Sequence, residues 1–291
     1  MKFGLAFANT MGWVEPQGAV EAARLAEDAG FESMWTVEHV IFPDDYQSAY
    51  PYSPTGKMPA GAATPIPDPL VWLAYIAAAT TRLRLATGIL ILPERNPLVL
   101  AKEVATLDYL SGGRVELGIG VGWLKEEFDA LGVPWEARGA RTDEYVEVLR
   151  ALWSSDHATY SGRFANFTNV SSNPKPVRGG VPIVIGGHSR AAAERAGRLG
   201  DGFFPGKGSE KALAARFDVV RQTAASAGRD PSTIEFTAGH PGLFGDDPVG
   251  AVQEMASIGV GRIILPAFAF FKPSPAEAFA AFAERVIRKV N

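Results

Sequence analysis

The feature that most constrains this chain is an alternation of short apolar runs with longer amphipathic runs, repeated eight times over 291 residues. The short runs have the length and composition of buried strands, and the long runs have the spacing of helices that cover a sheet. The expected strands are Lys2–Phe7, Ser33–Val37, Leu83–Ile89, Val115–Ile119, Val181–Ile185, Gly202–Phe204, Ile234–Ala238 and Arg262–Leu265. The expected helices are Gln17–Ala29, Pro69–Ala79, Pro97–Leu110, Arg141–Trp153, Ser189–Leu199, Lys207–Ala227, Val249–Ile258 and Pro275–Val290.

Eight strand–helix units without a break in composition predict an α/β fold, a (β/α)8 TIM barrel, built as a single domain over residues 1–291. A doubly wound sheet normally has fewer strands and a G-x-G-x-x-G turn after the first one. The first turn here reads ANTMG (residues 8–12), which lacks that spacing.

Two long insertions interrupt the alternation. One covers Ile41–Pro67 after the second strand, and the other covers about Ala158–Pro176 after the fourth. Loops of this length in a compact domain usually cover a site or are disordered. Both contain aromatic residues that can pack, so we expect them to have a function.

Composition excludes several classes of function. The chain has no cysteine, which removes disulfides, thiolate metal sites and a cysteine nucleophile. The net charge is −4 with both signs interspersed, so no nucleic-acid footprint is expected. The first residues lack the apolar core of a signal peptide, and the longest apolar stretch, Leu70–Ala79, is too short to span a membrane. We therefore expect a cytoplasmic protein that binds neither membrane nor nucleic acid.

In a TIM barrel the residues that follow each strand build the active face. Three of the four histidines, His39, His188 and His240, fall at such positions, and His157 does not. His39 is suited to orienting a bound ring or to giving it a proton. It is equally suited to a structural role, hydrogen-bonded to Glu38 or to backbone. Adjacent strand residues point to opposite faces, so we expect no metal site at Glu38 and His39.

Two glycine-rich turns follow strands. Gly186-Gly187-His188-Ser189 precedes a helix, where backbone N–H groups and the helix N-terminus suit a phosphate. Ser189 fits a simple helix cap equally well. The run GIGVG (118–122) ahead of Trp123 suits close approach of a flat ligand, or else a tight strand exit with Trp123 in the core. No hydrolase or kinase motif is present in the sequence.

Taken together, several segments resemble the bacterial luciferase-like monooxygenase superfamily, and within it the oxidoreductases that use the deazaflavin coenzyme F420. The resemblance is carried by SMWTVEHV (33–40), RLRLATGILILPERNPLVLAKEVATLDYLSGGRVELGIGVGWLKEEFDALG (82–132), RGARTDEYVEVLRALW (138–153) and VPIVIGGHSRAAAERAGRLGDGFF (181–204). It implies a (β/α)8 barrel whose flavin or deazaflavin ring lies at the C-terminal mouth, under an extended loop.

The resemblance also assigns roles to individual residues. It implies that His39, preceded by Glu38, is the catalytic histidine near the ring, and that a non-proline cis peptide at Gly88-Ile89 supports the ring. Asn96 would contact the pterin-like end of the ring. The phosphate-binding residues would be Gly186, Gly187, His188 and Ser189. Trp123 and the aromatic residues of the first insertion, among them Tyr50, would bind the substrate.

Two departures from the family pattern matter. At the position of Val121 in the expected cofactor site, luciferase has an arginine that helps to hold the flavin phosphate. The valine therefore disfavours a luciferase-like mode of binding FMN. The sugar-phosphate dehydrogenases of the F420 branch have an acidic proton donor at the position of Trp123. A sugar phosphate is therefore not supported as the substrate, and the sequence does not identify a proton donor.

The resulting hypothesis is hydride transfer between coenzyme F420 and a small organic substrate. One alternative is an FMN-dependent two-component monooxygenase, and another is a barrel that binds flavin without catalysis. The resemblance also implies a homodimer joined through the helices that follow the second and third strands, and the apolar segment Leu70–Ala79 fits that role.

Overall fold

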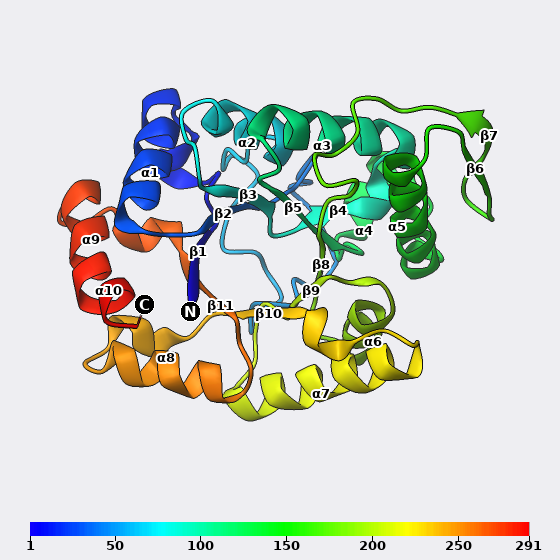
Figure 1. Ribbon diagram of the computed structural model, residues 1–291. Coiled ribbons are helices and arrows are strands. Elements are labelled where there is room, and N and C mark those ends of the chain that lie inside the picture. The colour runs from blue at the N-terminus through cyan, green and yellow to red at the C-terminus, as the bar shows by residue number, and fades with distance from the viewer. Residues whose placement is uncertain (291) are drawn as a thin grey trace.

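The computed structural model describes residues 1–290 and shows parallel strands closed into a barrel with helices outside (Figure 1). The barrel strands are β1 (Lys2–Ala6), β2 (Ser33–Thr36), β3 (Arg84–Thr87), β5 (Val115–Gly120), β8 (Ile183–Gly186), β9 (Gly202–Phe204), β10 (Glu235–Ala238) and β11 (Arg262–Pro266). They are hydrogen-bonded in the order β3-β2-β1-β11-β10-β9-β8-β5, and pairing of β3 with β5 closes the ring. The short strand β4 (Leu90–Ile91) extends β3 along β5. The predicted (β/α)8 barrel is confirmed.

The expected helices are all present within a few residues of their predicted bounds. They are α1 (Pro16–Ala29), α2 (Pro69–Ala77), α3 (Pro97–Ser111), α5 (Arg138–Ser154), α6 (Arg190–Leu199), α7 (Glu210–Ser226), α8 (Pro248–Ser257) and α9 (Pro275–Phe282). The last expected helix is interrupted by a π-helical turn at Ala283–Ile287, after which α10 (Arg288–Val290) ends the described chain. The short helix α4 (Lys125–Ala130) was not predicted. Among residues 1–290, no helix combines the length and apolar character needed to cross a membrane.

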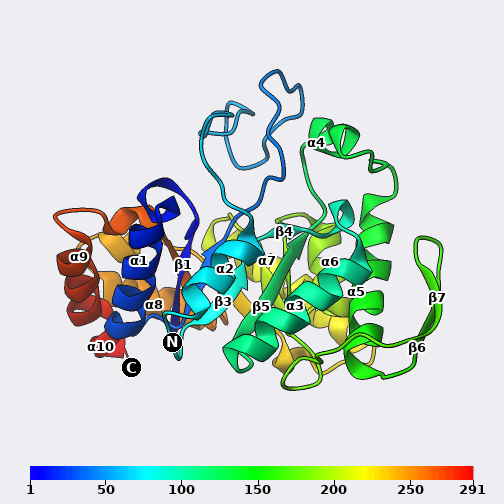
Figure 2. The same cartoon turned by 90° about the horizontal axis from the view of Figure 1, so that it is seen from above.

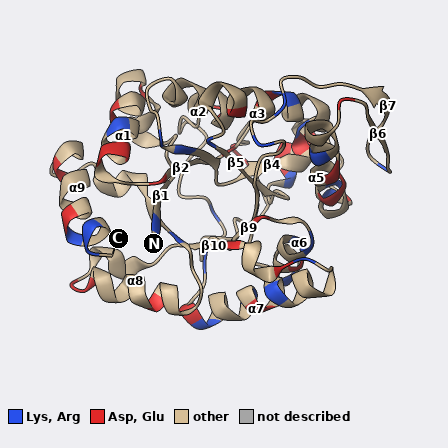
Figure 3. Cartoon of the chain, viewed as in Figure 1, with Lys and Arg blue, Asp and Glu red and all other residues tan. Residues whose placement is uncertain are grey.

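Local sequence signals explain where most helices begin and end. Proline occupies the first turn of five of them, where its missing N–H and fixed φ cost nothing. The side chains of Asp68 and Asn96 accept the first backbone N–H groups of α2 and α3. Gly30 and Gly112 end α1 and α3 in the left-handed conformation that glycine adopts without strain. Charged side chains of both signs are scattered over the outer helices (Figure 3).

The two insertions form different structures at different places on the barrel. Residues 41–67 form a lid that rises above the barrel on the same side as α4 (Figure 2). The second insertion forms a hairpin of β6 (Ala158–Ser161) and β7 (Asn166–Val170) that projects from the side of the barrel, away from the lid. Tyr160 and Phe167 stack across the hairpin with ring centroids 6.1 Å apart. The expectation that this segment covers a site or is disordered was therefore wrong.

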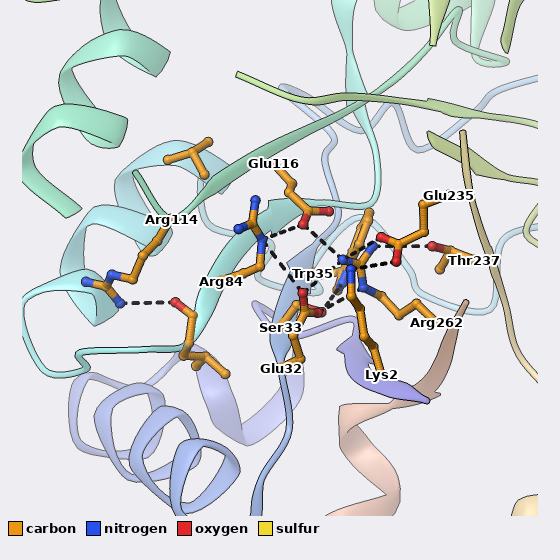
Figure 4. Close-up of polar contacts among 12 residues, drawn as sticks. Lys2, Glu32, Ser33, Trp35, Arg84, Arg114, Glu116, Glu235, Thr237 and Arg262 are labelled. Atoms are coloured by element: carbon orange, nitrogen blue, oxygen red, sulfur yellow. Dashed lines mark hydrogen bonds and ion pairs between the residues drawn. The ribbon is translucent and has the colours of Figure 1, made fainter. Parts of the chain in front are cut away.

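Charged side chains from the beginnings of six strands meet at the other end of the barrel (Figure 4). Arg262 is fully buried, and its guanidinium lies 2.9 Å from carboxylate oxygens of Glu32, Glu116 and Glu235. Arg84 and Lys2 pair with Glu116 at 2.5 Å and with Glu235 at 2.6 Å, which makes three cations for three carboxylates. Burial opposes ionisation of Glu32, but the hydrogen bonds and charge of Arg262 hold the pKa of Glu32 below its usual value.

Removing this central cation should destabilise the barrel strongly. Arg262→Met removes the central partner of the buried Glu116 and of the half-buried Glu32 and Glu235. Arg84 and Lys2 still pair with Glu116 and Glu235, so we expect a loss of about 3 kcal/mol of unfolding free energy, the lower end of the range for breaking a buried ion pair. Chemical denaturation followed by circular dichroism measures the loss. The control Arg288→Met removes an exposed pair with Glu284 and should cost under about 1 kcal/mol. Equal losses in the two variants would show that the buried cluster does not stabilise the barrel.

Candidate active site at the barrel mouth

The lid places a group of aromatic rings over the C-terminal end of β5. Trp123 follows β5, and edge-to-face contacts join its ring to those of His39, Tyr46 and Tyr50, with centroids 5.7, 5.6 and 5.0 Å apart. Aromatic pairs in this geometry are mutually attractive. The structure therefore brings together Trp123, Tyr50 and His39, three residues that the sequence assigned to the site, and Trp123 is one of the residues through which the barrel contacts the lid.

His39 is held by a glutamate that the sequence did not single out. Its Nδ1 lies 2.8 Å from Oε2 of Glu127, a fully buried residue of α4. A carboxylate at this nitrogen holds the ring proton there and fixes the orientation of the imidazole. The nitrogen Nε2 is then the one that can act on a bound group. The interpretation that pairs His39 with Glu38 was wrong, since the partner lies 88 residues away.

Glu127 and its neighbour Glu126 also fasten the lid. The other oxygen of Glu127 accepts the backbone N–H groups of Val40 and Ile41 at 2.6 and 3.2 Å. Glu126 accepts the N–H groups of Gln47 and Ser48 and the Ser48 hydroxyl. These bonds hold the pKa of Glu126 at about 2 although burial alone would raise it. One short helix thus orients the histidine and anchors the first half of the lid.

Glu38 is buried beside the site but points to different partners. Its carboxylate accepts the N–H of Ile91 at 2.5 Å and two N–H groups of Arg95, one at 2.9 Å. Arg95 in turn binds Asp68 at the start of α2. Burial raises the pKa of Glu38 even though the Arg95 charge opposes this. The contacts that the structure shows for Glu38 join β4 to α2, so they account for the residue without a role in catalysis.

Glu94 is an unpaired carboxyl in the same region. It ends the 3-10 turn Leu92–Glu94 that follows β4. Both carboxyl oxygens are buried, and neither has a hydrogen-bond partner among residues 1–290. Burial and the neighbouring carboxylates of Glu127 and Glu38 raise the pKa of Glu94 to about 9. A carboxyl whose burial favours its neutral form therefore lies among ionisable groups at the mouth, and sequence reasoning did not find it.

Most of the glycines expected at a cofactor serve the protein's own packing. The Gly88-Ile89 peptide bond is cis, as the resemblance implied. A Cβ on Gly120 or on Gly186 would lie 2.4 or 2.5 Å from the Ile89 side chain, and one on Gly122 would lie 2.5 Å from Phe128. Ile89 therefore inserts between the ends of β5 and β8. This packing explains the spacing of GIGVG (118–122) and the presence of Gly186, which were interpreted as allowing a ligand to approach.

The rest of the turn after β8 keeps the properties of an anion site. Gly187 has φ of +118°, and Ser189 caps α6 by accepting the N–H of Ala192 at 3.1 Å. The His188 ring follows Gly187, and its Nδ1 is buried without a partner among the described residues. Burial, with the positive charges of Lys207 and Arg216, lowers the pKa of His188. Two fixed cations, a helix N-terminus and an unpaired ring nitrogen all favour an anion here.

The remaining predicted residues lie around this mouth with different roles. The Asn96 side chain is exposed and caps α3, so the structure gives it a structural partner instead of a free amide. Val121 is half-buried just after β5. His240 accepts the N–H of Gly242 at Nδ1, so the Nε2 proton faces Glu210 and Glu254 at 3.4 and 3.7 Å. A protonated Nε2 does not ligate a metal.

An open cavity of about 480 Å³ continues the mouth over the ends of β9, β10 and β11. It is lined mainly by apolar side chains such as Leu213, Phe244 and Ile264, with Lys207 and His240 as its polar residues. Pockets of this kind, apolar with a few polar groups, are typical small-molecule sites. The lid spans from α4 to this side, because Lys207 binds the Pro51 carbonyl and Tyr52 contacts the His188 ring.

Removing the lid anchor should expose the lid. Glu127→Ala removes the acceptor for the N–H groups of Val40 and Ile41 where the lid begins. We therefore expect tryptic cleavage after Lys57, the only lysine or arginine in residues 41–67, to accelerate about tenfold. Mass spectrometry of timed digests measures the rate. In the control Asp129→Ala, an exposed residue of α4 that pairs only with Lys125, cleavage should keep the wild-type rate. Equal rates in both variants would contradict the anchoring role.

Comparison with known proteins agrees with this architecture. Rv0953c, an uncharacterized protein of Mycobacterium tuberculosis, is 38% identical over 186 residues, which are 64% of this chain and 65% of that protein. The FMNH2-dependent dimethylsulfone monooxygenase of Pseudomonas fluorescens is 34% identical over 207 residues, which are 70% of this chain and 52% of that enzyme. The chain thus spans less than two thirds of the length of these relatives.

Solved structures share the fold. An F420-dependent secondary alcohol dehydrogenase, in complex with an F420–acetone adduct, superposes with a TM-score of 0.78 at 19% identity and 98% coverage of both chains. The family model for luciferase-like monooxygenases matches residues 1–287, almost the whole chain. The protein is therefore a member of the luciferase-like monooxygenase family.

Proposed function

We propose that the protein transfers a hydride between the deazaflavin coenzyme F420 and a small organic substrate at the barrel mouth. The observation that carries this proposal is the buried Nδ1 of His188, which has no hydrogen-bond partner among residues 1–290 and lies near the charges of Lys207 and Arg216 at the N-terminus of α6. An anionic tail on a ring-shaped coenzyme fits this turn, and the ring would then extend toward His39. Val121, in place of the arginine of luciferase, favours the deazaflavin over FMN.

The chain's own residues would bind and orient the reactants. Ser189, Gly187 and the cations Lys207 and Arg216 would hold the anionic tail. When bound, the deazaflavin ring would supply a hydride and would not activate oxygen, because carbon replaces the reactive ring nitrogen. His39, oriented by Glu127, would stabilise charge through Nε2. The lid and Trp123 would exclude water from the reaction.

The substrate side of the site favours a small molecule without charge. Trp123 and Tyr50 present aromatic surface, and burial raises the pKa of Tyr50, so its phenol stays neutral at neutral pH. The cavity over β9–β11 adds mostly apolar walls. A ketone, aldehyde or alcohol of a few carbons would suit these surroundings better than an acid or a phosphate.

Binding of the coenzyme provides the first test. Fluorescence titration with coenzyme F420 should show saturable binding, and Ser189→Asp should weaken it at least about tenfold. Aspartate still caps α6, but its charge repels the anionic tail. The control Ser274→Asp makes the same change at the N-terminus of α9 and should bind like the wild type. A wild type that gives no saturable signal would remove the proposal.

Loss of the imidazole provides the second test. His39→Ala should lower the rate of oxidation of reduced F420 with a panel of small ketones and aldehydes by about 10²-fold or more, while coenzyme binding stays within a few-fold of wild type. Absorbance of the coenzyme follows the reaction. An unchanged rate would show that His39 has no part in the chemistry.

A second candidate is an FMN-dependent monooxygenase that receives reduced flavin from a partner reductase. The similarity to the dimethylsulfone monooxygenase favours it, since that relative uses FMNH2. The same anion site would then hold the FMN phosphate. Oxygen consumption that depends on reduced FMN and on an organic substrate, together with no response to F420, would select this candidate.

We also propose that the protein forms a homodimer through α2 and α3, which pack against each other. Both helices expose large apolar side chains, among them Val71 and Leu110, which are 70% and 77% exposed. An apolar surface of this kind is typical of an interface.

Light scattering tests the oligomer. Wild type should have twice the chain mass of 31.0 kDa, and Leu110→Glu should shift it toward the monomer because a charge would be buried at the interface. Lys211→Glu, an exposed change on α7, should remain dimeric. A monomeric wild type would contradict the proposal.

A further inference from the structure

The proposed reaction lacks a proton donor, since Trp123 stands where one branch of the family has its acid. The structure contains a carboxyl whose contacts are otherwise unexplained. Both oxygens of Glu94 are buried and have no hydrogen-bond partner among residues 1–290, whereas Glu38, Glu126 and Glu127 each accept several N–H groups. Buried polar atoms in native proteins are nearly always paired. The unpaired Glu94 carboxyl is an exception, which points to a hydrogen bond with a bound molecule.

The surroundings of Glu94 favour its neutral form. An ionised carboxylate without hydrogen bonds is costly to bury, and Glu94 adds to that cost by lying close to the carboxylates of Glu38 and Glu127. Arg95, whose charge opposes the rise in the pKa of Glu94, is already bound to Glu38 and Asp68. A neutral carboxyl has an O–H group, which is a donor without an acceptor in this site.

We propose that Glu94 is a protonated carboxylic acid in the resting protein and is the residue that gives a proton to the oxygen of a bound carbonyl substrate. This inference rests on the proposed function. Glu94 follows β4 at the mouth, on the same side of the barrel as His39 and Glu127. It would be a catalytic residue, distinct from Glu127, which positions His39.

The step balances without a further reactant. The Glu94 carboxyl would give its proton to the carbonyl oxygen, which takes it with the π pair, while the carbonyl carbon would take a hydride, two electrons and a hydrogen nucleus, that a bound reduced F420 would supply as it is oxidised. The product is an alcohol, and Glu94 is left as a carboxylate that regains a proton from water. In the opposite direction Glu94 accepts the hydroxyl proton as the alcohol is oxidised.

The electrostatics of the site suit this role at neutral pH. The pKa of Glu94 is about 9, because of burial first and then the charges of Glu127 and Glu38, with Arg95 opposing them. His39 also faces Glu127. An acid with a pKa near 9 is protonated at pH 7 and still close enough to that pH to release its proton in a reaction.

Infrared spectroscopy tests the protonation directly in the full protein. The spectrum of wild type minus Glu94→Gln at pH 7 should contain the carbonyl band of one carboxylic acid, and that band should disappear above about pH 9. Wild type minus Glu21→Gln, an exposed change on α1, serves as the matched control and should lack the band. A carboxylate signal from Glu94 at pH 7 would overturn the proposal.

Thermal stability gives a second readout that does not depend on activity. Folding raises the pKa of Glu94 from 4.5 to about 9. The stabilisation that Glu94 contributes to the free energy of unfolding is therefore fully present below pH 4.5 and is lost as the pH rises toward 9. Glu94→Gln does not titrate. Its melting temperature should therefore rise by several degrees relative to wild type between pH 5 and pH 9. A constant difference over this range counts against a neutral Glu94.

Kinetics separates this inference from the proposed function. Glu94→Gln should bind F420 as wild type does, but should reduce small ketones and aldehydes about 10²-fold more slowly, without the loss of rate near pH 9 seen in wild type. An unchanged rate and pH profile would overturn the role of Glu94 even when coenzyme binds. Failure of wild type to bind F420 would instead overturn the proposed function, and the infrared band would show that Glu94 itself was assigned correctly.

Discussion

The contacts of one buried arginine set the layout of the barrel. Arg262 joins carboxylates from β5, from β10 and from the residue before β2, so it ties together strands on different sides of the ring. Its guanidinium also lies 5.1 Å from the Trp35 ring, whose Nε1 donates to Ser33. Breaking such a cluster leaves unpaired buried charge. These contacts fix the end of the barrel at which the strands begin, and the buried Trp35 ring packs between Arg262 and the Phe204 ring at the end of β9.

The open end uses carboxyl groups in the opposite way. Glu38, Glu126 and Glu127 are satisfied by backbone N–H groups of β4 and the lid, and each holds a segment in place. Among the carboxyl groups of residues 1–290, Glu94 is the one whose buried oxygens have no partner. Charge balance at one end of the barrel provides stability, whereas at the other end the Glu94 carboxyl and the Nδ1 of His188 are left without hydrogen bonds within that part of the chain. Polar groups that a fold leaves unpaired are commonly those that a ligand completes.

The sequence predicted the barrel because every unit carries local signals. Prolines and capping side chains such as Asn96 mark helix starts, and apolar runs mark strands within a few residues. Sequence also located His39 and Trp123 at strand ends. It missed Arg95 and Glu127 because their partners lie 57 and 88 residues away, where no spacing rule applies. It missed Glu94 because burial of an unpaired carboxyl leaves no pattern in the sequence. The adjacent glutamates in LKEEF (124–128) were a weak signal. Two of the glycines that were interpreted as allowing a ligand to approach, Gly120 and Gly186, also have a packing reason, because a Cβ on either would clash with the Ile89 side chain.

The lid is bonded to the carboxylates of α4 and also to Lys207, beside the turn that follows β8. The first half of the lid is hydrogen-bonded to Glu126 and Glu127 of α4, the helix that also orients His39. Its middle rests on Lys207, which holds the Pro51 carbonyl beside the turn that suits an anion. An anionic coenzyme tail at this turn would attract the ammonium group that now holds the lid. If the proposed coenzyme binds here, its binding and the position of the lid would be linked through Lys207, while the anchor at α4 would keep the aromatic rings over His39 in place.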